Sequence, residues 1–404
     1  MTPEILVIGA GPGGSAAAWS LAAAGHDVLM VDAATFPRDK TCGDGLPPMA
    51  IQTMRHMGVI DKVEAAGAAR IDTVSLTAPR GTTARVSFAG SMGEGYYALV
   101  LRRTVLDDVL RQHAAEAGAA FMGGTRVTRL VWQGDTITAV HAGQTVFSPQ
   151  KVIIAVGANM GFLKRNGFLR SVPPVIRAAR SYYAQVSGLR QDYSFFFDAD
   201  LLPGYGWVFP TGPDTANIGI GVAEGAPRFN TQSTQSLLDE FVDRLVTNGT
   251  ITNVTHTGNP KGYPIRIDFP TGRIAGQNWA IVGEATGLVN PATGEGIDLA
   301  MASGLMAAEH ITSGRDLRGY GHQLRRRYKL MFDGLRFARD HFMTRRRLDY
   351  VVHLMTEHPF VERRVVNVAQ GFESPAVMFH PLLIALFFMP ISPRTAVRRL
   401  LNYA

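Results

Sequence analysis

The chain has 404 residues, of which 46% are hydrophobic and 18% are charged. This composition excludes a disordered chain and predicts about two to three domains or one large interleaved α/β unit. Lysine and arginine outnumber aspartate and glutamate by 40 to 33, a formal charge of +7. The excess indicates either solvated helix faces or attraction to an acidic protein, a pyrophosphate or an anionic membrane, and no motif supports nucleic-acid binding. Much of the excess positive charge lies in the C-terminal part of the sequence, at Arg325–Arg327, Arg345–Arg347, Arg398 and Arg399.

Cysteine content and hydropathy bear on the compartment. Cys42 is the one cysteine, so no intrachain disulfide is expected and the cytoplasm fits best. No secretory signal and no transmembrane span are predicted, because the longest late apolar run, Pro381 to Ile391, is shorter than the roughly 20 residues that cross a bilayer. Segment 379–401 is predicted to be either a helical hairpin packed on the body or a membrane-surface element. The 11 histidines lack metal-ligand spacing, so no metal site is predicted.

In chain order, the pattern alternates between buried strands and helices. Continuous apolar runs predict buried strands at 4–8, 26–31, 119–122, 151–156 and 279–283. Helical patterns cover 14–24, 105–117 and 296–312, and most of 317–404. Thr/Val-rich stretches of period two predict antiparallel strands within 71–90, 125–148 and 178–222. The chain is therefore predicted to be α/β, with a parallel sheet and a second, antiparallel sheet.

A glycine-rich turn follows the first strand and opens the first helix. Gly9 permits the tight turn, Gly11 lets backbone N–H groups approach a pyrophosphate, and Gly14 allows close packing of helix and strand. Asp32 ends the second strand, where its carboxylate can accept hydrogen bonds from a ribose. These features predict a Rossmann-type dinucleotide site, but the motif alone leaves NAD and FAD open. The full run is Gly9-Ala10-Gly11-Pro12-Gly13-Gly14.

A second glycine-rich segment runs from Ile281 to Ala300 as a strand, an acidic residue and a turn into a helix. A second strand, acidic residue and glycine-rich turn this far along the chain favour FAD over NAD, because an NAD-binding chain has no need of them. Here the sequence resembles the glutathione-reductase-type flavoproteins of the para-hydroxybenzoate hydroxylase group and, within it, the geranylgeranyl reductase family, whose late motif binds the ribitol and isoalloxazine. Glu284 stands where many relatives carry aspartate. The resemblance implies cofactor contacts from Gly283, Glu284, Gly294, Gly296 and Ile297.

Two further segments carry the resemblance. Phe36 to Gly45 resembles the family's loop beside the flavin, and Pro203 to Pro210 matches its Y-x-W-x-F-P signature. Arg103 fits the arginine that relatives place on the flavin side, and Val127 fits the strand position whose backbone meets the adenine. From residue 320 onward the resemblance fades. In the loop it implies cofactor contacts from Arg38, Lys40, Cys42 and Gly43.

One departure concerns the electron donor. Hydroxylase relatives carry Ala-Asp-Gly, whereas this chain reads Ala155-Val156-Gly157, so that carboxylate is missing at Val156. In hydroxylases the motif touches both FAD and NAD(P)H. Gly157 is kept as a predicted cofactor contact, and the resemblance implies a reductant protein such as ferredoxin, or reduced flavin, in preference to direct use of NAD(P)H.

The predicted substrate site is an aromatic wall. Tyr205 and Trp207 alternate along a strand, so their side chains point to the same face; they are either core aromatics or a cavity wall over the flavin. Phe209 and Pro291 are predicted to contact the substrate with them. Cys42 is either a small buried hydrophobe or a group that contacts flavin or substrate. The predicted catalytic residues are Cys42, Tyr205 and Trp207.

These observations predict a discontinuous FAD-binding domain (1–70, 98–160 and 273–320), a cavity-roof domain (71–97 and 161–272) and a C-terminal helical region (321–404). The predicted reaction is reduction of a carbon–carbon double bond in an apolar, prenyl-type substrate by hydride from N5 of reduced FAD. One alternative is a flavin-dependent monooxygenase or halogenase of aromatic or natural-product substrates. Another is a lipid or prenyl carrier in which FAD is a structural relic.

Overall fold

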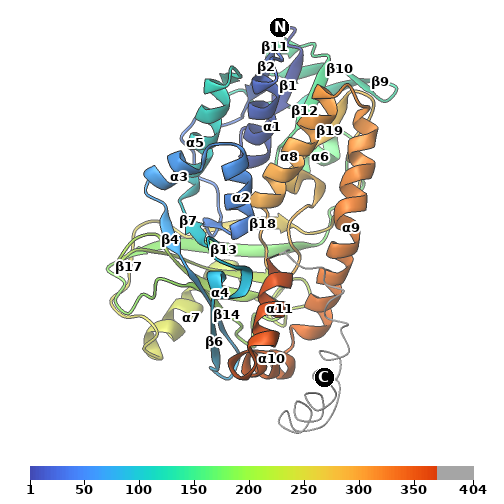
Figure 1. Ribbon diagram of the computed structural model, residues 1–404. Helices are drawn as coiled ribbons and strands as arrows, with labels where there is room; N and C mark the ends of the chain where they lie inside the picture. The colour runs from blue at the N-terminus through green and yellow to red at the C-terminus, as the bar shows by residue number, and fades with distance from the viewer. Residues whose placement is uncertain (371–404) are drawn as a thin grey trace.

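The computed structural model describes residues 1–370 (Figure 1). At its centre lies a five-stranded, all-parallel sheet in the order β19-β12-β1-β2-β8. Short apolar runs form these strands because both faces of the sheet are covered. Strands are confirmed at all five predicted places, but β8, at the edge of the sheet, is partly exposed where a buried strand was predicted. The five strands are β1 Ile5–Ile8, β2 Val28–Val31, β8 Ala120–Met122, β12 Lys151–Ile154 and β19 Trp279–Ile281.

Alternate residues of β1 face two different layers. Ile5 and Val7 lie in a core shared with three helices, and Leu6 and Ile8 face a core shared with a three-stranded antiparallel sheet and α6. The parallel sheet is thus the middle layer of three. The helices are α1 Pro12–Ala23, α8 Ile297–Thr312 and α9 Leu317–Phe342. The opposite layer contains β9 Arg129–Gln133, β10 Thr136–Ala142, β11 Thr145–Phe147 and α6 Met160–Arg165.

Helices α1 and α8 lie against each other through small residues. An ideal Cβ on Gly304 would lie 2.2 Å from the carbonyl oxygen of Gly13, and one on Gly13 would lie 2.9 Å from that of Ala300. The two backbones therefore meet without side chains between them. Since Gly13 and Ala300 are both in first turns, the two helix N-termini lie side by side at the carboxyl edge of the parallel sheet.

Another small layer packs beside α1. It consists of a three-stranded sheet, β3-β7-β4, and three helices. The strands are β3 Gly45–Leu46, β4 Ala69–Ile71 and β7 Ala98–Val100. The helices are α2 Pro48–His56, α3 Ile60–Ala65 and α5 Arg103–Glu116.

The roof sheet is an eight-stranded sheet in the order β17-β13-β16-β15-β14-β5-β6, with β18 also paired to β13. Its turn-rich, period-two sequence was expected to form antiparallel strands, and this is confirmed, except that β5 runs parallel to β14. Helix α7, Thr234–Thr247, packs on its outer face. The strands are β5 Thr73–Thr77, β6 Thr83–Ser87, β13 Val175–Ala184, β14 Tyr193–Phe196, β15 Tyr205–Pro210, β16 Ala216–Ala223, β17 Thr255–His256 and β18 Lys261–Arg266.

Helix α9 runs along the side of both lobes, and α10 (Arg345–Glu357) and α11 (Pro359–Ala369) return beneath the roof sheet (Figure 1). Val352 and Leu354 share a core with β5, β6 and the short helix α4, Phe88–Met92. Within residues 1–370, no helix combines the length and apolar character needed to cross a bilayer. Segment 379–401, for which membrane contact was an open prediction, lies outside the described residues.

We propose the division into an FAD-binding lobe, a roof lobe and C-terminal helices from this packing. The parallel sheet draws its strands from each of the three segments predicted for the FAD-binding lobe, and β5 and β6 join the roof sheet from 71–97. Helix α6 falls just beyond the predicted boundary at residue 160, yet Phe162 and Leu163 pack in the core of the parallel sheet. The lobe boundary is therefore better drawn after Leu169.

Candidate active site

A cavity of about 460 Å³ lies between the carboxyl edge of the parallel sheet and the inner face of the roof sheet. It is lined by the turn after β1, the loop 36–45, the turns after β12 and β19, the start of α8, and strands β13, β15 and β18. Segments that are far apart in sequence thus converge on one site. The FAD-binding lobe supplies its polar turns, and the roof sheet supplies its aromatic wall.

The turn after β1 is shaped for a closely approaching ligand. Gly9 has φ 105°, and an ideal Cβ there would lie 2.3 Å from the carbonyl oxygen of Ala155. An ideal Cβ on Gly14 would lie 1.9 Å from the carbonyl oxygen of Gly9. Gly11 is the N-cap of α1 and supplies no side-chain cap. The first N–H groups of the helix therefore remain available to an anion, which the helix dipole also favours.

Asp32 follows β2 at the cavity wall. Its two carboxylate oxygens accept hydrogen bonds from the backbone N–H groups of Ala10 and Ala34, each at 2.9 Å. These bonds fix the carboxylate beside the glycine-rich turn. Because each carboxylate oxygen can accept a second hydrogen bond, Asp32 can still receive ribose hydroxyls.

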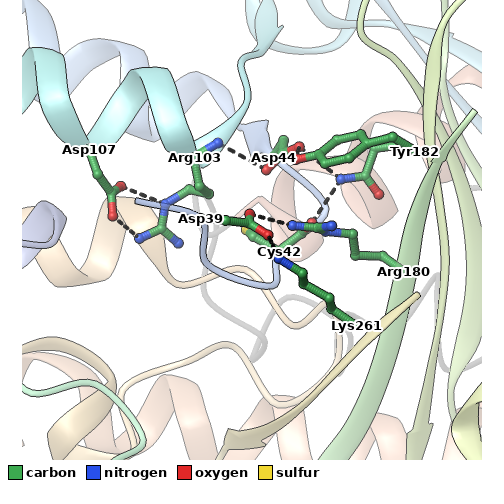
Figure 2. Close-up of polar contacts among 9 residues, drawn as sticks. Asp39, Cys42, Asp44, Arg103, Asp107, Arg180, Tyr182 and Lys261 are labelled. Carbon is green, nitrogen blue, oxygen red and sulfur yellow. Dashed lines mark hydrogen bonds and ion pairs between the residues drawn. The ribbon is translucent and has the colours of Figure 1, made fainter. Parts of the chain in front are cut away.

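Asp107 holds two arginines that line the cavity. Its fully buried carboxylate forms a bidentate pair with Arg103, at 2.6 Å to Nε and 2.7 Å to Nη2 (Figure 2). It also lies 2.9 Å from Nη2 of Arg38. Nη1 of Arg38 is buried without a hydrogen-bond partner among the described residues. An ideal Cβ on Gly11 would lie 3.4 Å from Nη2 of Arg38. An unpartnered guanidinium nitrogen beside an uncapped helix start fits a diphosphate.

Glu284 lies where the late motif predicts a ribitol contact. Its carboxylate is 3.5 Å from Nζ of Lys40 and accepts long hydrogen bonds, each 3.4 Å, from the Tyr263 hydroxyl and the Arg266 backbone. Burial alone would lower the pKa of Lys40, but the Glu284 carboxylate and Tyr263 raise it above its usual value, so Lys40 stays charged. The long contacts leave Glu284 room to accept a sugar-alcohol hydroxyl.

The loop 36–45 is tied to the roof sheet by hydrogen bonds (Figure 2). Asn217 of β16 donates to the Cys42 carbonyl at 2.8 Å and to Asp44 at 2.9 Å, and its own oxygen accepts from the Trp207 indole at 3.0 Å. Tyr182 donates to Asp44 at 2.6 Å. Burial raises the pKa of Asp44, although both hydrogen bonds oppose that shift. One buried network therefore fixes both the cysteine loop and the tryptophan.

A second tie joins the same loop to β13 and β18. Asp39 accepts from Arg180 at 2.5 Å and from Lys261 at 2.6 Å (Figure 2). Arg180 is 2% exposed and lines the cavity. The loop is thus clamped to the roof at Asp39 and again at Asp44.

The roof contributes a continuous aromatic wall. Tyr205 and Trp207 have ring centroids 6.2 Å apart, and Trp207 and Phe209 are 6.1 Å apart and stacked. Tyr193 and Phe195 extend the wall from β14. The Tyr205 hydroxyl donates to the Thr293 carbonyl, which joins the wall to the turn before α8. Apolar faces line the cavity while the polar ends of the rings are bonded away from it.

The cavity brings together nearly every predicted site residue. Two do not line it: Gly14, which packs against Gly9, and Pro291, which is buried beside the lining residue Ala292. Val127 does line it, but it lies in an irregular segment before β9, so its expected place on a strand is corrected. The predicted residues on the wall are Gly9, Gly11, Pro12, Gly13, Asp32, Arg38, Lys40, Cys42, Gly43, Arg103, Val127, Gly157, Tyr205, Trp207, Phe209, Gly283, Glu284, Gly294, Gly296 and Ile297.

Several residues of the site were not predicted from sequence. Asp107 and Asp44 are short-range neighbours of predicted residues, so their acidity next to Arg103 and Cys42 was a usable signal. Asn217 lies within a buried strand, and Tyr263 lies on β18, for which no strand was predicted, so neither stands out in the sequence. Glu295 was read as part of a glycine-rich turn and given no role of its own.

An uncapped helix start, an oriented acidic residue after β2 and a late glycine-rich turn around one cavity define an FAD-dependent oxidoreductase with a Rossmann-type domain. Residues 2–147 match the family model for an FAD binding domain, and residues 177–259 match that for the geranylgeranyl reductase catalytic domain. The chain belongs to the geranylgeranyl reductase family of FAD-dependent oxidoreductases. The resemblance, the fold class and the cofactor predicted from sequence are confirmed.

Curated relatives support this assignment. The chain is 33% identical over 323 residues to the menaquinone reductase of Mycolicibacterium smegmatis, covering 77% of this chain and 76% of that protein. It is 31% identical over 323 residues to digeranylgeranylglycerophospholipid reductase 1 of Methanopyrus kandleri, covering 76% of this chain and 79% of that protein. Both similarities extend over both lobes.

Solved structures share the fold. A geranylgeranyl bacteriochlorophyll reductase-like protein from Thermoplasma acidophilum superposes with a TM-score of 0.79 at 22% identity, covering 95% of this chain and 98% of that one. A flavin-dependent brominase gives a TM-score of 0.74 at 18% identity and covers 100% of both chains. At these identities the similarity establishes the fold alone, so it does not separate reductase from halogenase chemistry.

Proposed function

We propose that this enzyme reduces a carbon–carbon double bond in the prenyl chain of a lipid-soluble substrate, with a prenylated quinone as the substrate class. The observation that carries the proposal is the aromatic wall of Tyr205, Trp207 and Phe209 opposite the glycine-rich turns of the FAD-binding lobe. An apolar chain packs on such a surface without leaving polar groups unpaired. The relatives named menaquinone reductase, at 32–33% identity, favour a quinone over other prenyl lipids.

FAD, when bound, supplies the hydride for the double bond once it has been reduced. On the geometry above, the start of α1 and Arg38 would hold the diphosphate, Asp32 the ribose, and Glu284 the ribitol. The uncapped start of α8 at Gly296 offers backbone N–H groups to the ring. These roles use side chains and N–H groups that are oriented by their other contacts and still have hydrogen-bonding capacity.

The roof residues orient the substrate and exclude water. Trp207 is fixed by Asn217, and Tyr205 by the Thr293 carbonyl, so neither ring can turn freely. Cys42 lines the cavity from the loop that Asn217 holds. A fixed, apolar wall favours one bound position of a prenyl chain and keeps the reacting carbons away from water.

The test is a single turnover without oxygen. Holoenzyme is reduced with dithionite, mixed with menaquinone, and the product is analysed by mass spectrometry. We expect reoxidation of the flavin and a gain of two hydrogens in the prenyl chain. A parallel reaction with digeranylgeranylglycerophospholipid separates quinone from lipid substrates. Activity that requires dioxygen, or dioxygen with halide, would instead identify a monooxygenase or halogenase, and a flavin that never reoxidises with any prenyl substrate would support the carrier alternative.

We propose a protein or free-flavin electron donor. The support is the apolar Val156, which lines the cavity where hydroxylase relatives carry a carboxylate. The experiment compares the rates of flavin reduction by NADH, NADPH, reduced free flavin and reduced ferredoxin. Rapid reduction by NADPH alone would contradict the proposal.

We also propose contact with an anionic membrane surface. Arg326, Arg327 and Arg345–Arg347 are exposed on α9 and α10. Leu330 is 74% exposed and Phe337 is 43% exposed, two turns apart on the same face of α9. Basic residues around exposed apolar side chains are typical of surfaces that bind anionic lipid. Contact with a membrane would also bring the enzyme to a lipid-soluble substrate.

A further inference from the structure

We propose that Glu295 is the catalytic acid that delivers the proton in double-bond reduction; this inference rests on the proposed function. Reduction of an alkene needs two hydrogens of different kinds. One carbon receives a hydride, which the reduced flavin supplies as it is oxidised, and the other carbon receives a proton. In this step the carbon–carbon π bond, the N–H bond that held the hydride on the reduced flavin and the O–H bond of Glu295 break, two C–H bonds form, and the carboxylate is later protonated by water.

Four carboxyl groups line the cavity within residues 1–370, and three of them accept hydrogen bonds from backbone N–H groups or pair with cationic side chains. Asp32 accepts from two backbone N–H groups, Asp39 pairs with Arg180 and Lys261, and Glu284 pairs with Lys40. Glu295 has no cationic partner in the described part of the chain. It is therefore the cavity carboxyl that can carry a proton at neutral pH.

Glu295 accepts two side-chain hydrogen bonds, and both come from uncharged groups. Oε1 is 3.1 Å from Nε2 of Gln370, which can only donate, so Oε1 must act as an acceptor. The Thr293 hydroxyl donates to Oε2 at 3.1 Å and itself accepts from the Glu295 backbone N–H at 3.4 Å. Neither donor carries the positive charge that would hold Glu295 ionised. Thr293 and Glu295 both line the cavity, so the carboxyl borders the space in which the substrate would bind.

The position of Glu295 fits the substrate wall. It follows Thr293, whose carbonyl accepts from the Tyr205 hydroxyl, and an ideal Cβ on Gly294 would lie 3.3 Å from that hydroxyl. Glu295 also precedes Gly296 and Ile297, which start α8 and line the same cavity. The carboxyl thus lies between the aromatic wall and the backbone predicted to meet the flavin ring.

The surroundings of Glu295 also favour its protonated form. Burial, and next the nearby carboxyl of Asp298, raise the pKa of Glu295 to about 8, although Gln370 and Thr293 oppose the shift. Asp298 has its own pKa raised to about 6 by burial. The other titratable groups facing Glu295 are the hydroxyls of Tyr193 and Tyr205, whose pKa values are raised, so both stay neutral. General acids act best with a pKa near the working pH.

The test is the anaerobic single turnover with menaquinone, followed over a range of pH. In the wild type the rate should fall as pH rises through about 8, because Glu295 then loses its proton. Glu295→Gln should load FAD normally and be slowed roughly 10²- to 10⁴-fold, and its rate should no longer fall as pH rises through about 8. Glu309→Gln is the matched control, because Glu309 is an exposed carboxylate on α8, the helix that follows Glu295, and this variant should behave as wild type.

Two further measurements do not depend on the Gln variant remaining active. Asp298→Asn removes the acidic neighbour, so the alkaline limb should move to lower pH. Infrared spectra of the holoenzyme near neutral pH should contain a protonated-carboxyl band that disappears above about pH 9 and is missing in Glu295→Gln. A wild-type rate that is flat across this range, or a Gln variant that keeps the wild-type rate or limb, would overturn the assignment. If the wild type does not reduce menaquinone at all, the proposed function fails, and the infrared band still tests the proton on Glu295.

Discussion

At the scale of single residues, the site depends on carboxylates whose partners are not evident from local sequence. The glycines of the first turn, Asp32 and Glu284 were predicted because each stands at a fixed position relative to the end of a strand or the start of a helix. Asp44 meets Asn217 and Tyr182 across more than 130 positions of the chain. A contact of that kind depends on how the roof sheet is placed over the loop, which no local pattern specifies.

Asp107 provides the first residue-scale prediction. Asp107→Asn leaves the buried guanidinium of Arg103 and the half-buried one of Arg38 facing a neutral amide, so the free energy of unfolding of the holoenzyme should fall by about 3–5 kcal/mol. FAD content should fall as well, because Arg38 loses the partner that orients it. Urea denaturation and flavin absorbance per protein measure the two effects. Asp108→Asn removes a half-buried carboxylate that pairs with Arg111 on the same helix, and it should cost less than about 1 kcal/mol.

Cys42 provides the second. Cys42→Ala should retain FAD, since the loop is held through the Cys42 carbonyl and through Asp39 and Asp44, none of which the substitution removes. Turnover should change by roughly tenfold if the thiol contacts flavin or substrate. Anaerobic single-turnover rates of Cys42→Ala and Cys42→Ser measure this. Kinetics equal to wild type in both variants would make Cys42 a packing residue.

At the scale of elements, strands and helices followed from periodicity, but their neighbours did not. The five strands of the parallel sheet and helices α1, α5 and α8 lie where the sequence pattern predicts, whereas α2 and α3 were not predicted and β8 is less buried than expected. The parallel pairing of β5 with β14 could not be predicted from sequence. An alternating apolar pattern shows which face of a strand is buried, but it does not specify which strand lies beside it. The same holds for the contact of α1 with α8, which depends on glycines and alanines that are common in many helices.

The turn between β1 and α1 can be tested at this scale. Gly14→Ala would force a Cβ to within 1.9 Å of the Gly9 carbonyl oxygen, so helix and strand must separate. We expect a loss of about 3 kcal/mol in the free energy of unfolding and little bound FAD. Gly161→Ala in α6 is the control, since its Cβ would meet no atom closer than 3.5 Å. It should retain FAD and be slightly more stable. Equal FAD content in the two variants would contradict the role of the turn.

At the scale of the whole molecule, the net charge and exposed apolar side chains give a testable surface. The holoenzyme should bind vesicles that contain phosphatidylserine, and binding should weaken as salt rises. Leu330→Ser should weaken binding roughly tenfold, because an apolar side chain no longer enters the interface. Val146→Ser, at a side chain 41% exposed on β11, serves as control. Vesicle cosedimentation measures both variants. Vesicle binding that does not change with lipid charge or with salt concentration would contradict the proposal.

The strand order of the central sheet also affects how the protein is made. β1, β2, β8 and β12 leave the ribosome early, but β19 and the Gly283–Glu284 turn emerge only after the whole roof sheet has been synthesised. A nascent chain that stops before residue 279 lacks both an edge strand and the carboxylate expected to grip the ribitol. Loading of the coenzyme is therefore expected late in translation or after release, and the yellow colour of the protein reports that the first 284 of its 404 residues have folded together.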